Sequence, residues 1–281
     1  MIAGSRRLSL SQRLILYSIL AFLTLIVTFP FYWMVMTSLK SGAAIYDVGQ
    51  TLLAQNLTVQ PYFDMFQQRD IVRWILITAS LATVSTVIAL VIGIFGAYSI
   101  TDFRYRGRRF LGFAVFLAYV LPQAMLFIPL FLLLNALKLI DTFLGLVVAY
   151  QTICVPFCTW LLIGYFRTLP KEMKDAALID GCSPFGVLRY IILPLAGPGV
   201  VTAAIFSFTN VWNEFLYAAS FIQSTGMKTI SLGIAGFLSI DTYQWDQLMA
   251  AAVISTIPML VLFMFLQRFV VQGMTMGAVK G

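Results

Sequence analysis

The chain has 281 residues, of which 60% are hydrophobic and only 10% are charged, and its formal net charge is +7. This composition excludes an ordinary soluble domain, and apolar runs of bilayer length predict an all-α integral membrane protein. The sequence contains no histidine, which removes the usual ligand for zinc and the usual general base. The basic residues flank the apolar runs, so we expect a membrane-lipid environment and no nucleic-acid partner.

Six apolar segments are long enough to be transmembrane helices. The first is longer than the apolar core of a signal peptide, so we expect it to be retained. The expected spans are residues 14–36, 74–100, 110–136, 142–166, 195–219 and 248–267.

The remaining segments are a terminus of residues 1–13, polar loops at 37–73 and 220–247, a loop at 167–194 and a tail at 268–281. The aromatic residues between Tyr62 and Phe66 predict a short amphipathic piece at the membrane surface. Gly93 and Gly96 predict close packing of the second span against another helix.

The distribution of Lys and Arg predicts the orientation of the chain. One side of the six expected spans carries 13 of these residues, and the other side carries 5. The richer side holds both termini, the cluster at 104–109 and the loop at 167–194, which are therefore expected to be cytoplasmic. Residues 37–73 and 220–247 are then extracytoplasmic.

Prolines at 122, 129, 156, 198 and 258 lie in or at the start of expected spans. They predict static kinks that serve packing or, alternatively, a gate that opens by helix bending. Cys154 and Cys158 lie one helical turn apart and are expected to be small apolar core residues, so no metal site is expected.

The loop at 167–194 carries signals for two short helices. Pro170 opens the first helix, Gly181 ends it in a left-handed cap, and Ser183-Pro184 starts the second helix, which Pro194 interrupts. Met173, Ala176, Ala177 and Asp180 share one face of the first helix, which fits either docking into a partner's groove or internal packing.

The sequence holds no G-x-x-x-x-G-K-[ST] motif, so the chain is not expected to bind ATP through a P-loop. Uphill transport would then take its energy from an ion gradient or from another subunit. Ion-coupled carriers usually place ionisable residues deep in their spans, and only Glu214 fits that description, near the outer end of the fifth span. The pattern favours an outside energy source.

Four residues near that outer end form a polar and aromatic group: Trp212, Asn213, Glu214 and Tyr217. One interpretation is an aromatic belt at the membrane interface with Glu214 reaching water or headgroups. The other is a lining of the substrate pathway, in which Asn213 and Glu214 bond sugar hydroxyls while an aromatic ring stacks on the sugar.

The run Asp175-Ala176-Ala177, Gly181 and Leu193-Pro194 resembles the "EAA" loop of ABC-importer permeases, with Asp175 in place of the usual Glu. In that family the loop is a coupling helix that seats in a separate ATPase subunit. The resemblance implies that Asp175, Ala176, Ala177, Asp180, Gly181 and Pro194 couple this chain to an ATPase and catalyse nothing.

Further segments are similar to the carbohydrate-uptake subfamily, with its permease core at about residues 70–267. They are Ala97-Tyr98 with Phe103–Gly107, the Trp-Asn-Glu-Phe run that begins at Trp212, and a tail ending in Gly273, Gly277, Ala278, Lys280 and Gly281. The tail could reach the ATPases or be a disordered terminus. One departure is Ala79, where that subfamily commonly has Asn.

The chain thus resembles the smaller permease of maltose-type importers in bacterial or archaeal cytoplasmic membranes. The resemblance implies a type I importer fold, a second permease in a heterodimer, an ATP-binding subunit dimer that uses ATP and Mg²⁺, and an extracytoplasmic solute-binding protein. It also implies alternating access, with no cofactor on this chain. A permease for glycerol phosphate, a polyol or an osmolyte, or an ion-coupled transporter, is the alternative.

Overall fold

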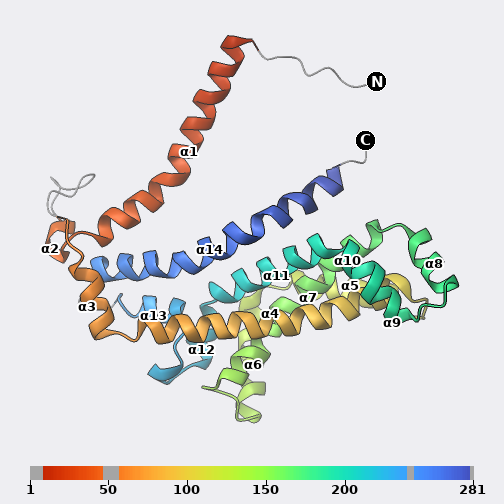
Figure 1. Cartoon of the computed structure of the whole chain (residues 1–281). Helices are drawn as coiled ribbons and strands as arrows, with labels where there is room; N and C mark the ends of the chain where they lie inside the picture. Colours follow the sequence, from red (N-terminus) through yellow and green to blue (C-terminus); the bar gives the residue numbers. More distant parts are fainter. Residues whose placement is uncertain (1–8, 47–56, 239–243, 279–281) are drawn as a thin grey trace. The chain divides into compact units, whose positions relative to one another are not determined.

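The computed structural model describes residues 9–46, 57–238 and 244–278, and within these ranges the protein is built from helices (Figure 1). This confirms the all-α fold class. The helices are α1 (Leu10–Ser38), α2 (Gly42–Ile45), α3 (Gln60–Gln68), α4 (Ile71–Asp102), α5 (Arg108–Val120), α6 (Gln123–Ala136), α7 (Phe143–Thr168), α8 (Lys171–Ile179), α9 (Pro184–Val187), α10 (Leu193–Leu195), α11 (Gly197–Trp212), α12 (Leu216–Phe221), α13 (Ile230–Ala235) and α14 (Trp245–Ala278).

The chain divides into two units, and the helix α14 contributes to both. The first unit comprises residues 1–69 and 237–254, and the second comprises residues 70–236 and 255–281. The expected terminal residues Arg6, Arg7, Lys280 and Gly281 lie outside the described residues, whereas the backbone of the tail is helical as far as Ala278.

The first unit begins with a capped apolar helix. The hydroxyl of Ser9 accepts the backbone N–H of Gln12, and the Gln12 side chain accepts the N–H of Ser9, so both orphan donors are satisfied. The helix α1 is 29 residues long, which is enough to span a bilayer. At its far end Ser38 is buried and lies 2.8 Å from the hydroxyl of Tyr62 in α3.

The short helix expected around Tyr62–Phe66 is present as α3. It buries Pro61 and Met65 and exposes Phe63 and Phe66. The sequence therefore predicted an amphipathic helix correctly, and its position at a membrane surface stays a prediction.

The core of the second unit is formed by α4, α7 and α11, which pack side by side (Figure 1). Gly93 allows α4 to approach α7 closely, because a Cβ atom there would lie 2.8 Å from Cβ of Cys158 and 3.2 Å from the amide nitrogen of Thr159 in α7. Cys154 and Cys158 are buried in this core, as expected, and the sulfur of Cys158 lies 3.0 Å from the hydroxyl of Ser207.

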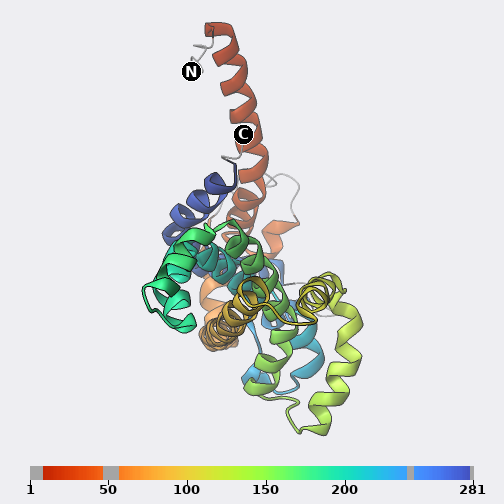
Figure 2. The same ribbon diagram turned by 90° about the vertical axis from the view of Figure 1, so that its right-hand side faces the viewer.

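Two of the six expected spans are broken helices. Four helices in the described residues are long and apolar enough to cross a membrane, and two bent pairs would bring the number to six. Within residues 110–136, α5 and α6 meet at 98°. They are the yellow and lime helices of Figure 2. The break falls at Leu121-Pro122. Pro122 has no backbone N–H, so it cannot donate the hydrogen bond that would continue α5.

A tight turn joins α6 to α7 and is tied to the segment after α12. Asp141 has a positive φ of 59°, and its Oδ1 accepts the backbone N–H groups of Gln223 and Ser224, each at 3.0 Å, and the Ser224 hydroxyl. The backbone N–H of Ser224, followed by that of Gln223, lowers the pKa of this carboxyl, since these bonds favour its charged form.

Candidate functional site

The segment from Lys171 to Leu195 folds into the two short helices that its sequence predicts. The helix α8 ends in a Schellman motif, in which the N–H of Gly181 bonds to the carbonyl of Leu178 and that of Cys182 bonds to Ala177. Gly181 has a φ of 88°, which a residue with a side chain rarely adopts. We call Lys171–Leu195 the coupling loop.

The second helix of the coupling loop starts with the expected cap. The hydroxyl of Ser183 accepts the N–H of Gly186 at 3.1 Å, and Pro184 occupies the first helical position, where its missing N–H costs nothing. The left-handed Gly181 and the cap at Ser183 together turn the chain sharply between α8 and α9.

A π-helical turn, Leu188–Ile192, then leads into α10. Pro194 lies within α10, and the helix breaks two residues later, at Ala196. The segments on either side of the break meet at 78°. The interruption expected at Pro194 is thus present, but it is displaced toward Gly197-Pro198.

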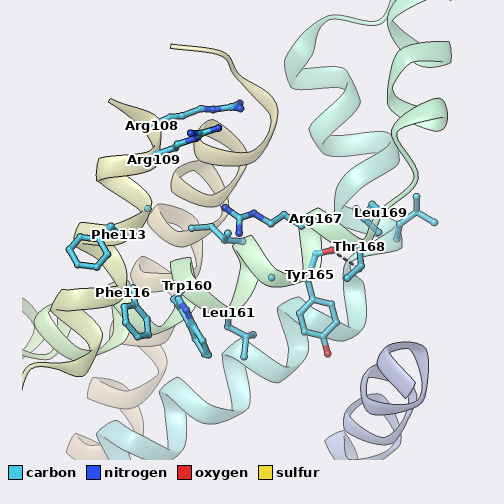
Figure 3. Close-up of a pocket in the computed structure, with 14 residues that line it drawn as sticks. Arg108, Arg109, Phe113, Phe116, Trp160, Leu161, Tyr165, Arg167, Thr168 and Leu169 are labelled. Atoms are coloured by element: carbon cyan, nitrogen blue, oxygen red, sulfur yellow. Dashed lines mark hydrogen bonds between the residues drawn. The ribbon is translucent and has the colours of Figure 1, made fainter. Parts of the chain in front are cut away.

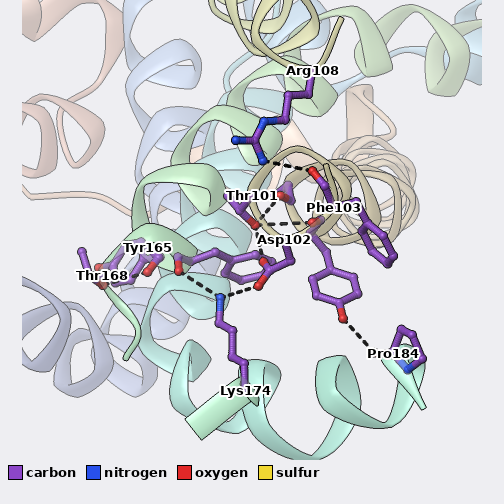
Figure 4. Close-up of polar contacts among 11 residues, drawn as sticks. Thr101, Asp102, Phe103, Arg108, Tyr165, Thr168, Lys174 and Pro184 are labelled. Carbon is purple, nitrogen blue, oxygen red and sulfur yellow. Dashed lines mark hydrogen bonds and ion pairs between the residues drawn. The ribbon is translucent and has the colours of Figure 1, made fainter. Parts of the chain in front are cut away.

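The inner side of the coupling loop is fastened to α4 by an ion pair. Nζ of Lys174 lies 2.7 Å from Oδ1 of Asp102, the last residue of α4, and the two side chains are only 11% and 17% exposed. The same ammonium group lies 3.5 Å from the carbonyl oxygen of Phe166 in α7. Figure 4 shows Lys174 pointing toward Asp102. Tyr98 adds a second tie by donating its hydroxyl to the carbonyl of Pro184 at 2.8 Å.

Apolar packing supports these polar ties. Ala177 is 7% exposed and joins a buried cluster with Val187, Leu188 and Ile192 of the coupling loop. The cluster continues into α4 and α7 through Ala97, Tyr98, Ile100, Leu162, Ile163 and Phe166. The coupling loop is therefore part of the core of the second unit.

The outer side of α8 is open to its surroundings. Ile179 is 86% exposed and Met173 is 44% exposed, and Ala176 and Asp180 are exposed beside them. These four residues, Met173, Ala176, Ile179 and Asp180, are called the outer face below. The face that the sequence predicted is thus divided, since Ala176 points outward and Ala177 points into the core.

A polar cavity of about 670 Å³ lies between the end of α4 and the inner side of α8. Its lining includes Asp175 with Asp102, Arg104, Lys171 and Lys174. Asp175 therefore lines a charged cavity and is not part of the outer face. Its role in coupling stays a prediction.

The second candidate group, near the outer end of the fifth span, is mostly buried. Trp212 is 3% exposed, Glu214 is 7% exposed and Tyr217 is fully buried, whereas Asn213 is exposed and donates its side-chain N–H to the carbonyl of Thr209. The structure does not place these four side chains on one common surface.

Glu214 fastens a bend of the chain. Its Oε1 accepts the side-chain amide of Gln123 at 2.8 Å and the N–H of Tyr217 at 2.8 Å, and its Oε2 accepts the N–H of Ala218 at 3.2 Å. The carboxylate joins the gap between α11 and α12 to the start of α6. Every contact of Glu214 that we describe is thus internal, and a role in the substrate pathway stays a prediction.

Three residues of these networks were missed from the sequence: Asp102, Lys174 and Gln123. Gln123 carried the clearest signal, because it is a polar residue directly after Pro122 within an apolar run. Among the described residues no group of three His, Cys, Asp or Glu side chains is arranged to hold a metal ion.

Comparison with known proteins gives a consistent family. Residues 89–276 match the family described as "Binding-protein-dependent transport system inner membrane component". The inner membrane ABC transporter permease protein YcjP of Escherichia coli strain K12 is 31% identical over 272 residues, which cover 96% of this chain and 97% of that protein. The trehalose transport system permease protein SugB of Mycobacterium tuberculosis is 33% identical, covering 90% and 92%.

A solved structure shows the same fold. One chain of a bacterial ABC transporter involved in the import of the acidic polysaccharide alginate superposes with a TM-score of 0.79, at 22% identity, over 94% of this chain and 99% of that one. The family match, the two relatives and the shared fold agree with the coupling loop and the membrane-length helices. The chain belongs to the family of inner membrane components of binding-protein-dependent transport systems.

Proposed function

We propose that this permease imports a sugar or oligosaccharide, driven by an ATPase that docks on the outer face of α8. The observation that carries the proposal is the division of α8 into two sides. Lys174 and Ala177 hold the helix against its own chain, and Ile179 is 86% exposed at the other side. A helix that is fixed on one side and apolar on the other fits a groove in a partner.

The ion pair gives this docking a mechanical consequence. A force on α8 would pass through Lys174 and Asp102 to the end of α4, and through the apolar cluster to α7. Closure of an ATPase dimer would then move the ends of α4 and α7 at the same time. Alternating access requires such a joint movement of spans. ATP and Mg²⁺ would be bound by the partner subunits, and a second permease would complete the pathway.

The orientation follows from the basic residues. We place the coupling loop and both termini in the cytoplasm, because the ends of the spans near the loop carry most of the Lys and Arg. The solute-binding protein, which the family description implies, would dock on the opposite side.

The solute class rests on the relatives. Trehalose is the named solute of one relative with 33% identity over 90% of this chain, and alginate, a polysaccharide, is named for the solved transporter. A screen of mono- and disaccharides, glycerol phosphate and polyols against the solute-binding protein tests this class directly. Binding of polyols or glycerol phosphate in preference to all sugars would contradict the proposal.

The ATPase contact is tested by Ile179→Asp. We expect this variant to insert normally and to lose most of the co-purifying ATPase, with affinity falling about tenfold or more, because a charge replaces an apolar anchor. The matched control is Phe63→Asp in α3, where the side chain is 58% exposed. Full retention of the ATPase by Ile179→Asp, or uptake by this chain in liposomes without ATP, would contradict the proposal.

A further inference from the structure

The transport proposal makes no use of a groove that lies between α5 and α7. It has a volume of about 670 Å³ and is bounded by residues 108–116 of α5, residues 160–168 of α7, and Leu169 and Leu195 (Figure 3). The groove lies within the second unit, and Leu195, the last residue of the coupling loop, is part of its lining.

The greater part of the groove is apolar. Phe113 is 59% exposed, Phe116 is 42% exposed and Trp160 is 40% exposed, so three large rings face the open space. Gly164 leaves one wall open, since a Cβ atom there would meet nothing within 4 Å outside its own helix turn. An occupant must therefore offer apolar surface along this length.

The other part of the groove is cationic. Arg108 and Arg109 lie at one end, with Arg167 between them and the rings in Figure 3. Among the residues that the structure describes, no Asp or Glu lines the groove. Asp102, which shares a neighbouring cavity with Arg108 and Arg167, is engaged by Lys174 at 2.7 Å.

A smaller cavity shows that the three arginines converge. It has a volume of about 140 Å³, and its lining consists of Arg108, Arg109 and Arg167 with Ile100 and Thr101. Guanidinium groups are suited to phosphate, because they can donate two parallel hydrogen bonds to its oxygens. The two cavities together offer a phosphate site at the head of an apolar channel.

We propose that this groove binds an anionic phospholipid, with its phosphate among Arg108, Arg109 and Arg167 and an acyl chain along Phe113, Phe116 and Trp160. Basic pockets between spans at the cytoplasmic surface are suited to anionic headgroups. A purely apolar partner helix would bury three cations without counter-charges, which is costly, and a small soluble anion would leave the rings uncovered. The proposal uses the orientation inferred above only to assign the lipid to the cytoplasmic leaflet.

The test measures retained lipid on the purified full chain with its co-purifying subunits, in detergent titrated with phosphatidylglycerol or phosphatidylcholine. We expect wild type to retain phosphatidylglycerol preferentially. The double variant Arg109→Gln/Arg167→Gln should weaken that binding ~30-fold, since each basic residue near an anionic lipid contributes ~5-fold. Gly164→Leu, which fills the groove and keeps all three charges, should also weaken it.

The matched control is Arg104→Gln/Arg106→Gln. It makes the same change in net charge within the neighbouring segment, at two exposed residues that do not line the groove. This control should retain phosphatidylglycerol as wild type does. Equal loss in both double variants, or unchanged binding in Gly164→Leu, would overturn the site. Displacement of the lipid by inorganic phosphate alone would overturn the part assigned to the acyl chain.

A second measurement leaves the arginines and Gly164 unchanged. A photoreactive benzoylphenylalanine in place of Phe113 should cross-link to phospholipid in native membranes. Cross-linking to a second permease or to another copy of this chain would show that a protein occupies the groove, and would overturn the proposal.

Discussion

The coupling loop joins two apolar spans and the bend at Glu214 interrupts one, and a nearly buried charged side chain fastens each of these segments. Lys174 is paired with the opposite charge of Asp102 on α4. In contrast, each hydrogen bond to Glu214 described above comes from a neutral donor. The larger difference lies on the other side of each segment. The coupling loop presents Ile179 at 86% exposure, whereas the bend places Trp212 and Tyr217 in the core and leaves Phe215 46% exposed.

This difference shows how a buried charge should be interpreted in such a chain. In both places the charge fastens the chain to itself, and it does not by itself mark a contact with a solute or a partner. An exposed apolar side chain in a polar loop is the better indication of a partner, because contact with water gives no reason for an apolar side chain to be there.

The variant Ala177→Arg should have the largest effect on stability. It places a long cation in the apolar cluster behind α8, and we expect the free energy of unfolding to fall by about 4 kcal/mol. Thermal unfolding of the purified protein measures the change. Ala176→Arg, one residue earlier and exposed, is the control and should leave the melting temperature near that of wild type.

If Ala177→Arg were as stable as wild type and lost only the ATPase, the inner and outer sides of α8 would be assigned the wrong way round. The original expectation from the sequence, a single docking face containing both alanines, would then be restored.

Glu214→Ala should have the next largest effect. It leaves the amide of Gln123 and the N–H groups of Tyr217 and Ala218 without their acceptor, at a cost of about 3 kcal/mol. Glu214→Gln keeps one acceptor oxygen and should lose less. A stable Glu214→Ala variant with altered solute uptake would instead support the pathway interpretation of this residue.

Lys174→Met should destabilise the protein by about 2 kcal/mol, less than a fully buried pair would, because both side chains retain some exposure. Adding Asp102→Leu removes the charge left unpaired, so the double variant should recover part of the loss. Thermal unfolding of the two single variants and the double variant gives the coupling energy. Additive losses would show that the ion pair does not fasten α8 to α4.

Asp141→Asn should have the smallest effect, with a melting temperature within about 2 °C of wild type at neutral pH. Because the pKa of Asp141 is lowered in the folded state, its contribution to stability is fully present above the ordinary pKa of an aspartate, about 4, and is lost as the pH falls through the lowered pKa. The difference between wild type and variant should therefore shrink in acid. A difference that grows in acid would contradict the described hydrogen bonds to Gln223 and Ser224.

Local signals allowed the start of α8, its left-handed cap and the cap of α9 to be predicted. Pro170, Gly181 and Ser183 act on their own backbone or on the next turn, so a single sequence contains the information needed. The bend at Pro122 was less predictable, because a proline within an apolar run can kink a helix slightly or break it, and the neighbouring packing decides.

The inner and outer sides of α8 could not be separated in this way. Ala176 and Ala177 are identical in chemistry and adjacent in sequence, and the partner of Lys174 is 72 residues away, at Asp102. Periodicity states which residues share a helix face and does not state which neighbour that face meets. Periodicity likewise did not state that Trp212, Glu214 and Tyr217 would be buried while Asn213 is exposed, and their pathway role stays a prediction.

The two sides of α8 are expected to evolve under constraints from different proteins. Substitutions at Lys174 or Ala177 can be compensated only within this chain, at Asp102 or in the apolar cluster. If the ATPase docks on the outer face as proposed, changes at Ile179 or Met173 can be compensated in the ATPase. Across related importers, the inner residues of α8 should therefore covary with α4, and the outer residues should covary independently with the ATPase. An exchange of ATPases between related importers would then change only the outer residues of α8.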